Sequence, residues 1–182
     1  MLDQTIDKTA VIDVLNKILE AELAGVVRYT HYSFMVYGYN RIPIIKWLRE
    51  QADESLLHAQ EAGELVTLLG GHPSLAIGKL LESYKHDIGS ILRESLEHEH
   101  EALALYRQLL EITGGRDVML EEYARQMIAE ETRHAAEVDK MLRQPGEYGP
   151  VPAKIDVPKS EAGAPQSGIE APQTGMEVPK TG

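Results

Sequence analysis

Cysteine is absent from this chain of 182 residues. That absence excludes disulfides, iron–sulfur clusters and thiolate zinc sites, so any bound metal must be held by carboxylates and imidazoles. Long apolar runs are absent too, and none approaches the roughly 20 residues needed to span a bilayer. No charged and then apolar leader is visible in residues 1–17. We therefore expect a cytoplasmic protein with no membrane partner.

Basic residues are scarce. The chain has 18 lysines and arginines against 29 acidic residues, a formal net charge of −11. Nucleic acids are bound through basic patches, and the aromatic residues here are not spaced as a stacking platform for bases. We therefore expect no nucleic-acid partner, and a stress protein that coats DNA is disfavoured. An acidic surface or cavity attracts cations, although the charge is equally well explained by solubility alone.

Four stretches of the chain carry apolar residues at alternating spacings of three and four, the period of an amphipathic helix. Their approximate bounds are 8–37, 43–69, 87–114 and 117–143. Short loops join the first stretch to the second and the third to the fourth, so each pair should be antiparallel. A long connection from Gly70 to His86 should let the third helix run parallel to the second. This connectivity resembles a ferritin-type four-helix bundle, and we predict an all-α fold of that kind.

The composition divides the chain into a helical domain, 1–146, and a tail, 147–182. The tail is rich in proline, glycine and serine, and prolines recur every seven residues at 158, 165, 172 and 179. Proline at that frequency forbids a helix, so we expect a disordered or polyproline-like segment. A solvated extension and a short docking segment for a partner both fit this composition.

Six carboxylate and imidazole side chains, of the kinds that bind metals, lie on or beside the apolar stripes of the four predicted helices. They are Glu22, Glu54, His58, Glu99, Glu131 and His134. A buried carboxylate costs several kcal/mol unless it has a partner, a proton or a metal. Such side chains on all four helices predict a shared polar site inside the bundle.

The pattern of these side chains fits a di-iron plan, in which two helices each supply a Glu and two each supply a Glu-x-x-His. Glu22 and Glu99 fit the single carboxylates, and Glu131 with His134 forms one complete Glu-x-x-His. Residues three apart share a helix face, and their oxygen and nitrogen donors suit Fe(II), Mn(II) or Zn(II). Carboxylates that bridge two irons can change binding mode as the iron is oxidised, which is how such sites activate dioxygen.

The second predicted helix breaks the pattern, because Ser55 stands three residues before His58. The nearest carboxylate is Glu54, which lies about 40° from His58 around the helix axis. Glu54 replaces the missing ligand, or the site keeps five protein ligands with water or an open position, or the second metal binds weakly or not at all.

Three motifs resemble those of bacterioferritins. They are Leu-Asn-Lys-Ile-Leu-Glu-Ala-Glu-Leu at 15–23, His-Ala at 58–59 with Leu-Leu-Gly-Gly-His-Pro at 68–73, and Glu-Glu-Thr-Arg-His at 130–134. The resemblance covers about residues 9–142. It implies a ferroxidase in which dioxygen or peroxide oxidises Fe(II), with ferric mineral stored in a hollow homo-oligomeric cage. Tyr29 falls where the family carries a tyrosine beside the metals; it is either a packing residue or a catalytic helper that donates an electron or a hydrogen bond.

Two departures from the bacterioferritin pattern matter. Bacterioferritins bind haem through a methionine just after the second-helix Glu, and the corresponding residue here is Leu56. Met35 and Met127 are interpreted as core residues, so we expect no methionine-ligated haem. Ser55 is the other departure, and it puts the symmetric di-iron site in doubt.

The remaining histidines are weaker candidates. His98 would assist the centre without binding metal, and the neighbouring Glu97, His100 and Glu101 should be solvated, face a subunit or form an accessory metal site. His86 with Asp87 opens the third helix, most simply as a cap and alternatively as a surface metal site. His31 and His72 should be surface or loop residues.

Two rival functions stay open. A di-metal oxidase or peroxidase could use the same bundle without a storage cage. A structural or cargo protein could keep the polar core as a vestige and use the tail for docking.

Overall fold

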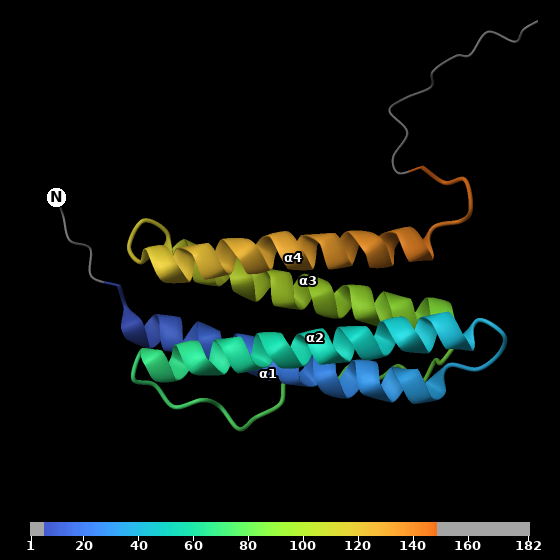
Figure 1. Cartoon of the computed structure of the whole chain (residues 1–182), viewed down its shortest axis with the longest axis horizontal. Coiled ribbons are helices and arrows are strands. Elements are labelled where there is room, and N and C mark those ends of the chain that lie inside the picture. Colours follow the sequence, from blue (N-terminus) through green and yellow to red (C-terminus); the bar gives the residue numbers. More distant parts are fainter. Residues whose placement is uncertain (1–5, 149–182) are drawn as a thin grey trace, which may run out of the picture. The chain divides into compact units, whose positions relative to one another are not determined.

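The structure, a computed structural model, describes residues 6–148 and contains four helices (Figure 1). They are α1 (Lys8–Met35), α2 (Arg41–Leu68), α3 (Ile88–Thr113) and α4 (Val118–Leu142). No strand occurs in residues 6–148. The predicted all-α, ferritin-like class is therefore confirmed. No helix in this part of the chain is long and apolar enough to cross a bilayer.

Three of the helices begin at an aspartate that satisfies free backbone N–H groups of the first turn. Asp7 accepts hydrogen bonds from the N–H groups of Thr9 and Ala10 at 3.1 Å. Asp87 caps α3 through Ser90 at 2.9 Å, and Asp117 caps α4 in the same way. The predicted role of Asp87 as an N-cap is confirmed.

The helices form two antiparallel hairpins, α1 with α2 and α3 with α4, and α1 also packs against α3. The long connection returns the chain so that α2 and α3 run in the same direction (Figure 1). The predicted crossover is therefore present. Between α2 and α4, His58 contacts Glu131 and Glu54 contacts His134.

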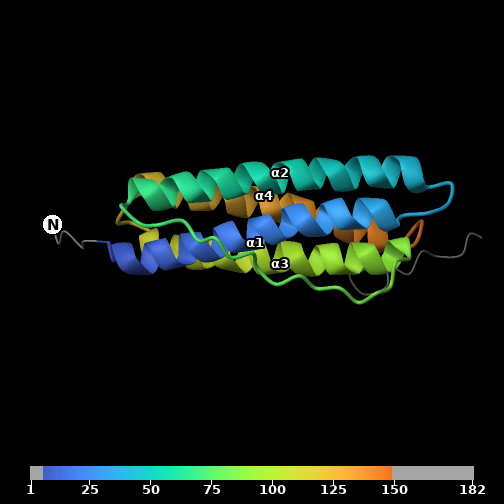
Figure 2. The ribbon, with the colours of Figure 1, turned by 90° about the horizontal axis from the view of Figure 1, so that it is seen from below.

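The connection between α2 and α3 lies along α1 for most of its length (Figure 2). Asn16 bonds to residues 72 and 74, and the backbone carbonyl of Glu20 accepts the N–H of Gly78 at 2.8 Å. A Cβ at Gly78 would lie 2.8 Å from that carbonyl oxygen, so this close approach requires glycine. Further along, the Tyr32 hydroxyl donates to the carbonyl of Leu81 at 3.1 Å. These contacts fix the connection on the surface of α1.

Two clusters of buried apolar residues hold the bundle together. One extends along α1 from Val11 to Leu19, and the other contains Tyr29 and Tyr32. Glu22 and Gly25 lie between the two clusters along α1 and are also buried. The same order holds in α2, where Ser55 is buried between Ala52 and Ala59. The polar site therefore lies between two apolar cores.

Details at the helix ends differ from the sequence prediction. The first helix was expected to reach Tyr37, but Val36 is extended (φ −77°, ψ 124°) and Gly38 is left-handed (φ 91°), so α1 ends at Met35. Met141, near the end of α4, is 39% exposed. Residues 149–182 lie outside the described residues, and the boundary at 146 and the character of the tail stay predictions.

Candidate metal centre

Glu131 of α4 lies at the middle of the polar site and is 3% exposed. Its Oε1 atom is 3.2 Å from Nδ1 of His58 on α2, and its Oε2 atom is 3.7 Å from Nδ1 of His134. His134 is one turn further along α4 and shares the inward face of that helix. The two oxygens of one carboxylate thus face two different imidazoles.

Two donor groups overlap at Glu131. Glu22, His58 and Glu131 form one group, and the other is formed by Glu99, Glu131 and His134. In each group the donor atoms lie within 4.8 Å of one another. A pair of cations held here would share the Glu131 carboxylate.

Two tyrosines hold the outer carboxylates in place. Tyr29 donates a hydrogen bond to Oε1 of Glu99, and Tyr106 donates to Oε1 of Glu22 at 2.9 Å. Both phenols are buried, so water does not compete for these bonds. The bond from Tyr106 to Glu22 could not be predicted from the sequence, because tyrosines at helical spacing are usually packing residues.

Glu54 reaches the same centre from α2. Its Oε1 atom is 3.3 Å from Nε2 of His134, and Gln51 donates to its Oε2 atom at 3.2 Å. The Glu54 side chain is 31% exposed, so this side of the centre opens toward solvent. It also lies in a donor group with His58 and Glu130. The structure thus brings Glu54 within reach of both histidines, although its role as a ligand stays a prediction.

Ser55, which stands where the pattern calls for Glu, lies at the contact between α1 and α2. A Cβ added to Gly25 would lie 2.7 Å from Oγ of Ser55 and 2.7 Å from Nε2 of His98. A glycine and a serine thus let these two helices approach closely beside the centre. The larger acidic side chain is one residue earlier, on the side that faces α4.

The ring of His98 packs edge-on against Tyr29 with the centroids 5.8 Å apart, and this histidine is 4% exposed. Burial, followed by the positive charge of Arg28, lowers the pKa of His98 to about 4. It is therefore a neutral imidazole that packs beside the centre. Its neighbours Glu97, His100 and Glu101 are exposed, as expected.

The fold and the donor geometry can now be set beside known proteins. The ferritin-like domain model matches residues 12–145. The chain belongs to the ferritin-like family. The bacterioferritin of Rhodobacter capsulatus is 27% identical to this ferritin-like chain over 145 residues, which cover 77% of this chain and 87% of that protein. The bacterial ferritin of Neisseria meningitidis serogroup B is 28% identical over 92 residues, half of this chain, and the match spans only 58% of that relative's length.

Solved structures agree with this assignment. A ferritin-like diiron-carboxylate protein from Bacillus anthracis superposes with a TM-score of 0.71 at 25% identity, covering 75% of this chain and 98% of that one. The dodecameric thioferritin of Bacteroides fragilis, a bacterioferritin-related protein, gives a TM-score of 0.71 at 26% identity and covers 76% and 87%. The predicted resemblance to bacterioferritins is confirmed, and this kinship is consistent with iron storage.

The electrostatics of the ferritin-like centre favour bound cations. Burial raises the pKa of Glu22, and it raises that of Glu99 well above its usual value. Burial would raise the pKa of Glu131, but its close contacts with His134, His58 and Glu99 outweigh burial and lower the pKa. Burial alone would lower the pKa of His58, but the nearby carboxylates of Glu131 and Glu22 raise it to about 10.

The raised pKa values of Glu22, Glu99 and His58 favour their protonated forms when no cation is bound, and bound metal would displace such protons. Three buried carboxylates and two imidazoles supply oxygen and nitrogen donors from all four helices. That donor set fits a pair of divalent cations such as Fe(II).

Proposed function

We propose that this ferritin-like protein is a ferroxidase that takes Fe(II) as its substrate and releases or stores Fe(III). The observation that carries the proposal is the position of Glu131 between His58 and His134, at 3.2 Å and 3.7 Å. One carboxylate aimed at two imidazoles is the arrangement that a pair of irons needs. Two Fe(II) give up one electron each; dioxygen takes up the two electrons and two protons to become hydrogen peroxide, or peroxide takes them up to become two waters.

Five residues are proposed as ligands, with Glu54 as a sixth. Glu22 and His58 would hold one iron, Glu99 and His134 the other, and Glu131 would bind both. Of the three readings of the second helix, the 3.3 Å approach of Glu54 to His134 favours Glu54 as the replacement for the Glu missing at position 55. Its partial exposure suits a ligand that meets incoming iron.

The chain's own groups have three tasks in this proposal. Tyr106 and Tyr29 orient the carboxylates of Glu22 and Glu99 by hydrogen bonds. Glu99 and His58 release protons as Fe(II) enters, which keeps the charge of the buried centre balanced. Tyr29, whose hydroxyl bonds to Glu99, would act as the predicted helper that donates an electron or a hydrogen bond.

Storage in a homo-oligomeric cage is the second part of the proposal. It is supported by kinship with the Rhodobacter bacterioferritin and with the dodecameric protein from Bacteroides fragilis. The rival is a di-metal oxidase or peroxidase that uses the same bundle without a storage cage. Native mass after iron loading separates the two: a large assembly that retains ferric iron supports storage, and a dimer that retains none supports the rival.

The test of ferroxidase activity is rapid mixing. Protein loaded with Fe(II) without oxygen is mixed with aerated buffer, and ferric absorbance is followed. We expect oxidation well above the protein-free rate, and a loss of about a hundredfold or more in Glu131→Gln, since that residue serves both irons. Glu97→Gln, an exposed carboxylate on α3, is the matched control and should behave like wild type. Equal rates in Glu131→Gln and wild type would contradict the proposal, and no Fe(II) binding at all would favour a structural protein.

A further inference from the structure

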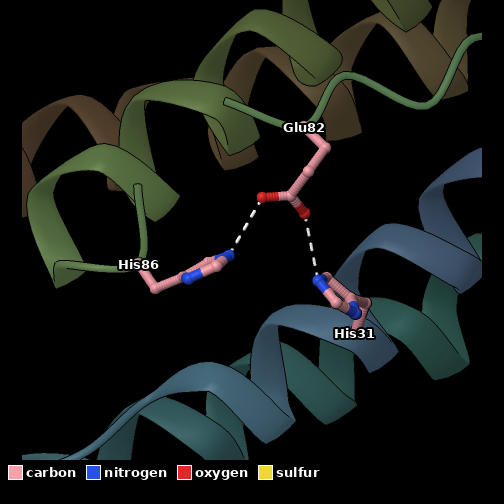
Figure 3. Close-up of side chains that lie close together, drawn as sticks. All are labelled: His31, Glu82 and His86. Carbon is pink, nitrogen blue, oxygen red and sulfur yellow. Dashed lines mark hydrogen bonds and ion pairs between the residues drawn. The ribbon is translucent and has the colours of Figure 1, made fainter. Parts of the chain in front are cut away.

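A second cluster of metal-type side chains lies away from the centre, where the long connection meets α1 and the start of α3 (Figure 3). Oε2 of Glu82 is 3.0 Å from Nε2 of His31, and Oε1 of Glu82 is 3.0 Å from Nε2 of His86. The three donor atoms lie within 4.8 Å of one another. The two imidazole rings approach with centroids 6.2 Å apart and planes at 69°. Figure 3 shows both rings turned toward the single carboxylate.

We propose that His31, Glu82 and His86 bind a divalent transition-metal cation that fastens the connection to α1 and to the start of α3. Two imidazoles and one carboxylate suit a borderline cation such as Zn(II) and are a poor match for Ca²⁺ or Mg²⁺, which prefer oxygen. Donor atoms around tetrahedral zinc, with bonds of about 2.0–2.1 Å, lie about 3.3 Å apart. The observed separations need only small side-chain movements to meet that geometry.

The three ligands are held in place by contacts just beside them in the chain. His31 belongs to the rigid α1, and the next residue, Tyr32, donates to the carbonyl of Leu81 at 3.1 Å, immediately before Glu82. The N–H of Ser83, immediately after Glu82, donates to the Glu94 carboxylate at 2.9 Å. These anchors hold Glu82 over α1.

His86 is held in place by the residue that follows it. Asp87 caps α3 by accepting hydrogen bonds from both the N–H and the hydroxyl of Ser90. Preorganised ligands lower the entropic cost of binding a cation. Each of the three donors is thus adjacent to an anchored residue.

The backbone between Glu82 and His86 makes a tight turn. Tyr84 has φ of 56°, the one positive φ outside glycine in residues 6–148, and its N–H donates to Oε1 of Glu82 at 2.9 Å. A left-handed tyrosine is strained and persists only where the surroundings impose it. This turn folds His86 back over Glu82, so that both face His31.

The local charges are compatible with a cation. Arg28, one turn before His31 on α1, donates to the backbone carbonyl of Glu94 at 2.7 Å, and Lys85, beside His86, is exposed to solvent. The Glu94 carboxylate carries the opposite charge and interacts with Arg28. Glu82 is 24% exposed, His86 28% and His31 47%, so a hydrated cation has access from solvent.

The test uses the full-length protein, stripped of metal, and titrates Zn(II) against a coloured chelator of known affinity. We expect the double variant His31→Gln, His86→Gln to bind one zinc fewer per chain, or to bind that equivalent at least about tenfold more weakly. His72→Gln, an exposed histidine of the same connection, is the matched control and should keep the wild-type stoichiometry. Unchanged stoichiometry and affinity in the double variant would overturn the proposal.

Two further readouts separate this site from the proposed ferroxidase centre. Crystals of the wild-type protein grown with zinc should give an anomalous peak among the three side chains, and a map with no peak there would refute the site even if the double variant failed to fold. Zinc should slow amide hydrogen exchange at residues 81–86 in the wild type and leave it unchanged in the double variant. Fe(II) oxidation by the double variant should match wild type, so the two proposals fail separately.

Discussion

At the scale of single residues, each outer carboxylate of the candidate centre is paired with a phenol: Glu22 with Tyr106, and Glu99 with Tyr29. A hydrogen bond from a buried phenol fixes the orientation of a carboxylate at little cost, because the phenol has no water to lose. Removing a side chain that hydrogen-bonds to a metal ligand typically lowers the affinity for the metal about tenfold to a hundredfold.

We therefore expect Tyr106→Phe to lower Fe(II) affinity by about tenfold. The bond of 2.9 Å to Glu22 is lost while the ring, which packs edge-on to Tyr123, is retained. Anaerobic Fe(II) titration measures the change. The control is Tyr123→Phe, another buried tyrosine, whose hydroxyl has no hydrogen-bond partner among the described residues. An affinity loss in the control as large as in Tyr106→Phe would argue against a specific effect on Glu22.

A single substitution also tests whether Glu54 is a metal ligand. If Glu54 replaces the Glu missing at position 55, Glu54→Ala should bind one Mn(II) per chain with unchanged affinity and the second at least about tenfold more weakly, measured in a His31→Gln, His86→Gln background that removes the second proposed site from the count. Glu50→Ala, an exposed carboxylate one turn earlier on α2, is the control and should bind both. Mn(II) binding followed by electron paramagnetic resonance gives the stoichiometry. Two tightly bound ions in Glu54→Ala would exclude Glu54 as a ligand.

The sequence predicted which acidic and imidazole side chains converge, because each interrupts an apolar stripe on its own helix. It did not predict their partners. The contact of Glu54 with His134 depends on the rotamers of two side chains on different helices. Glu82 lies in a loop with no periodicity, so no pattern in the sequence distinguished it from a solvated residue.

At the scale of helices, the contact between α1 and α2 beside the centre depends on a missing side chain. Gly25 on α1 faces Ser55, whose Cβ would be 3.2 Å from an added Cβ, in addition to the two contacts of 2.7 Å. Gly63 on α2 has nothing within 4 Å of the same position. The close contact between α1 and α2 thus requires glycine at position 25, whereas the space beside Gly63 would admit a side chain.

The two glycines should respond to alanine with opposite signs. Gly25→Ala should destabilise the fold by about 1–3 kcal/mol, since overpacking forces α1 and α2 apart. Gly63→Ala should stabilise it by about 0.5–1 kcal/mol through the higher helix propensity of alanine. Chemical denaturation of the metal-free protein measures both. A neutral Gly25→Ala would mean that Ser55 and His98 move aside freely.

Helix bounds were predictable to within about two residues, because glycine and aspartate mark the ends chemically. The path of the long connection was not predictable. It depends on the bond between the Gly78 N–H and the Glu20 carbonyl, and backbone groups of this kind are present at every position of the chain. The sequence therefore indicated a crossover without indicating that residues 72–82 follow α1.

At the scale of the whole protein, the buried centre links stability to metal and to pH. The pKa of His58 is raised to about 10, and those of His134, Glu22 and Glu99 are also raised. A raised pKa stabilises the folded state below the unfolded pKa, and this contribution is lost as pH rises through the folded value. For His58 the loss runs from the ordinary value of 6.5 to about 10. His98, with its pKa lowered to about 4, contributes no change above pH 6.5.

The metal-free protein should therefore lose about 1–3 kcal/mol of its free energy of unfolding between pH 7 and pH 9. One proton contributes at most about 1.36 kcal/mol per pH unit. The Mn(II)-loaded protein should lose much less, because an imidazole bound to metal is already neutral and has no imidazolium proton to release in this pH range. Denaturation at both pH values, with and without Mn(II), measures the difference. In His58→Gln the metal-free loss should shrink, since that variant lacks the main titrating group. A metal-free stability that rises from pH 7 to pH 9 would show that the buried carboxylates and imidazoles do not hold protons in the folded state. It would remove the electrostatic argument that the centre is built for cations.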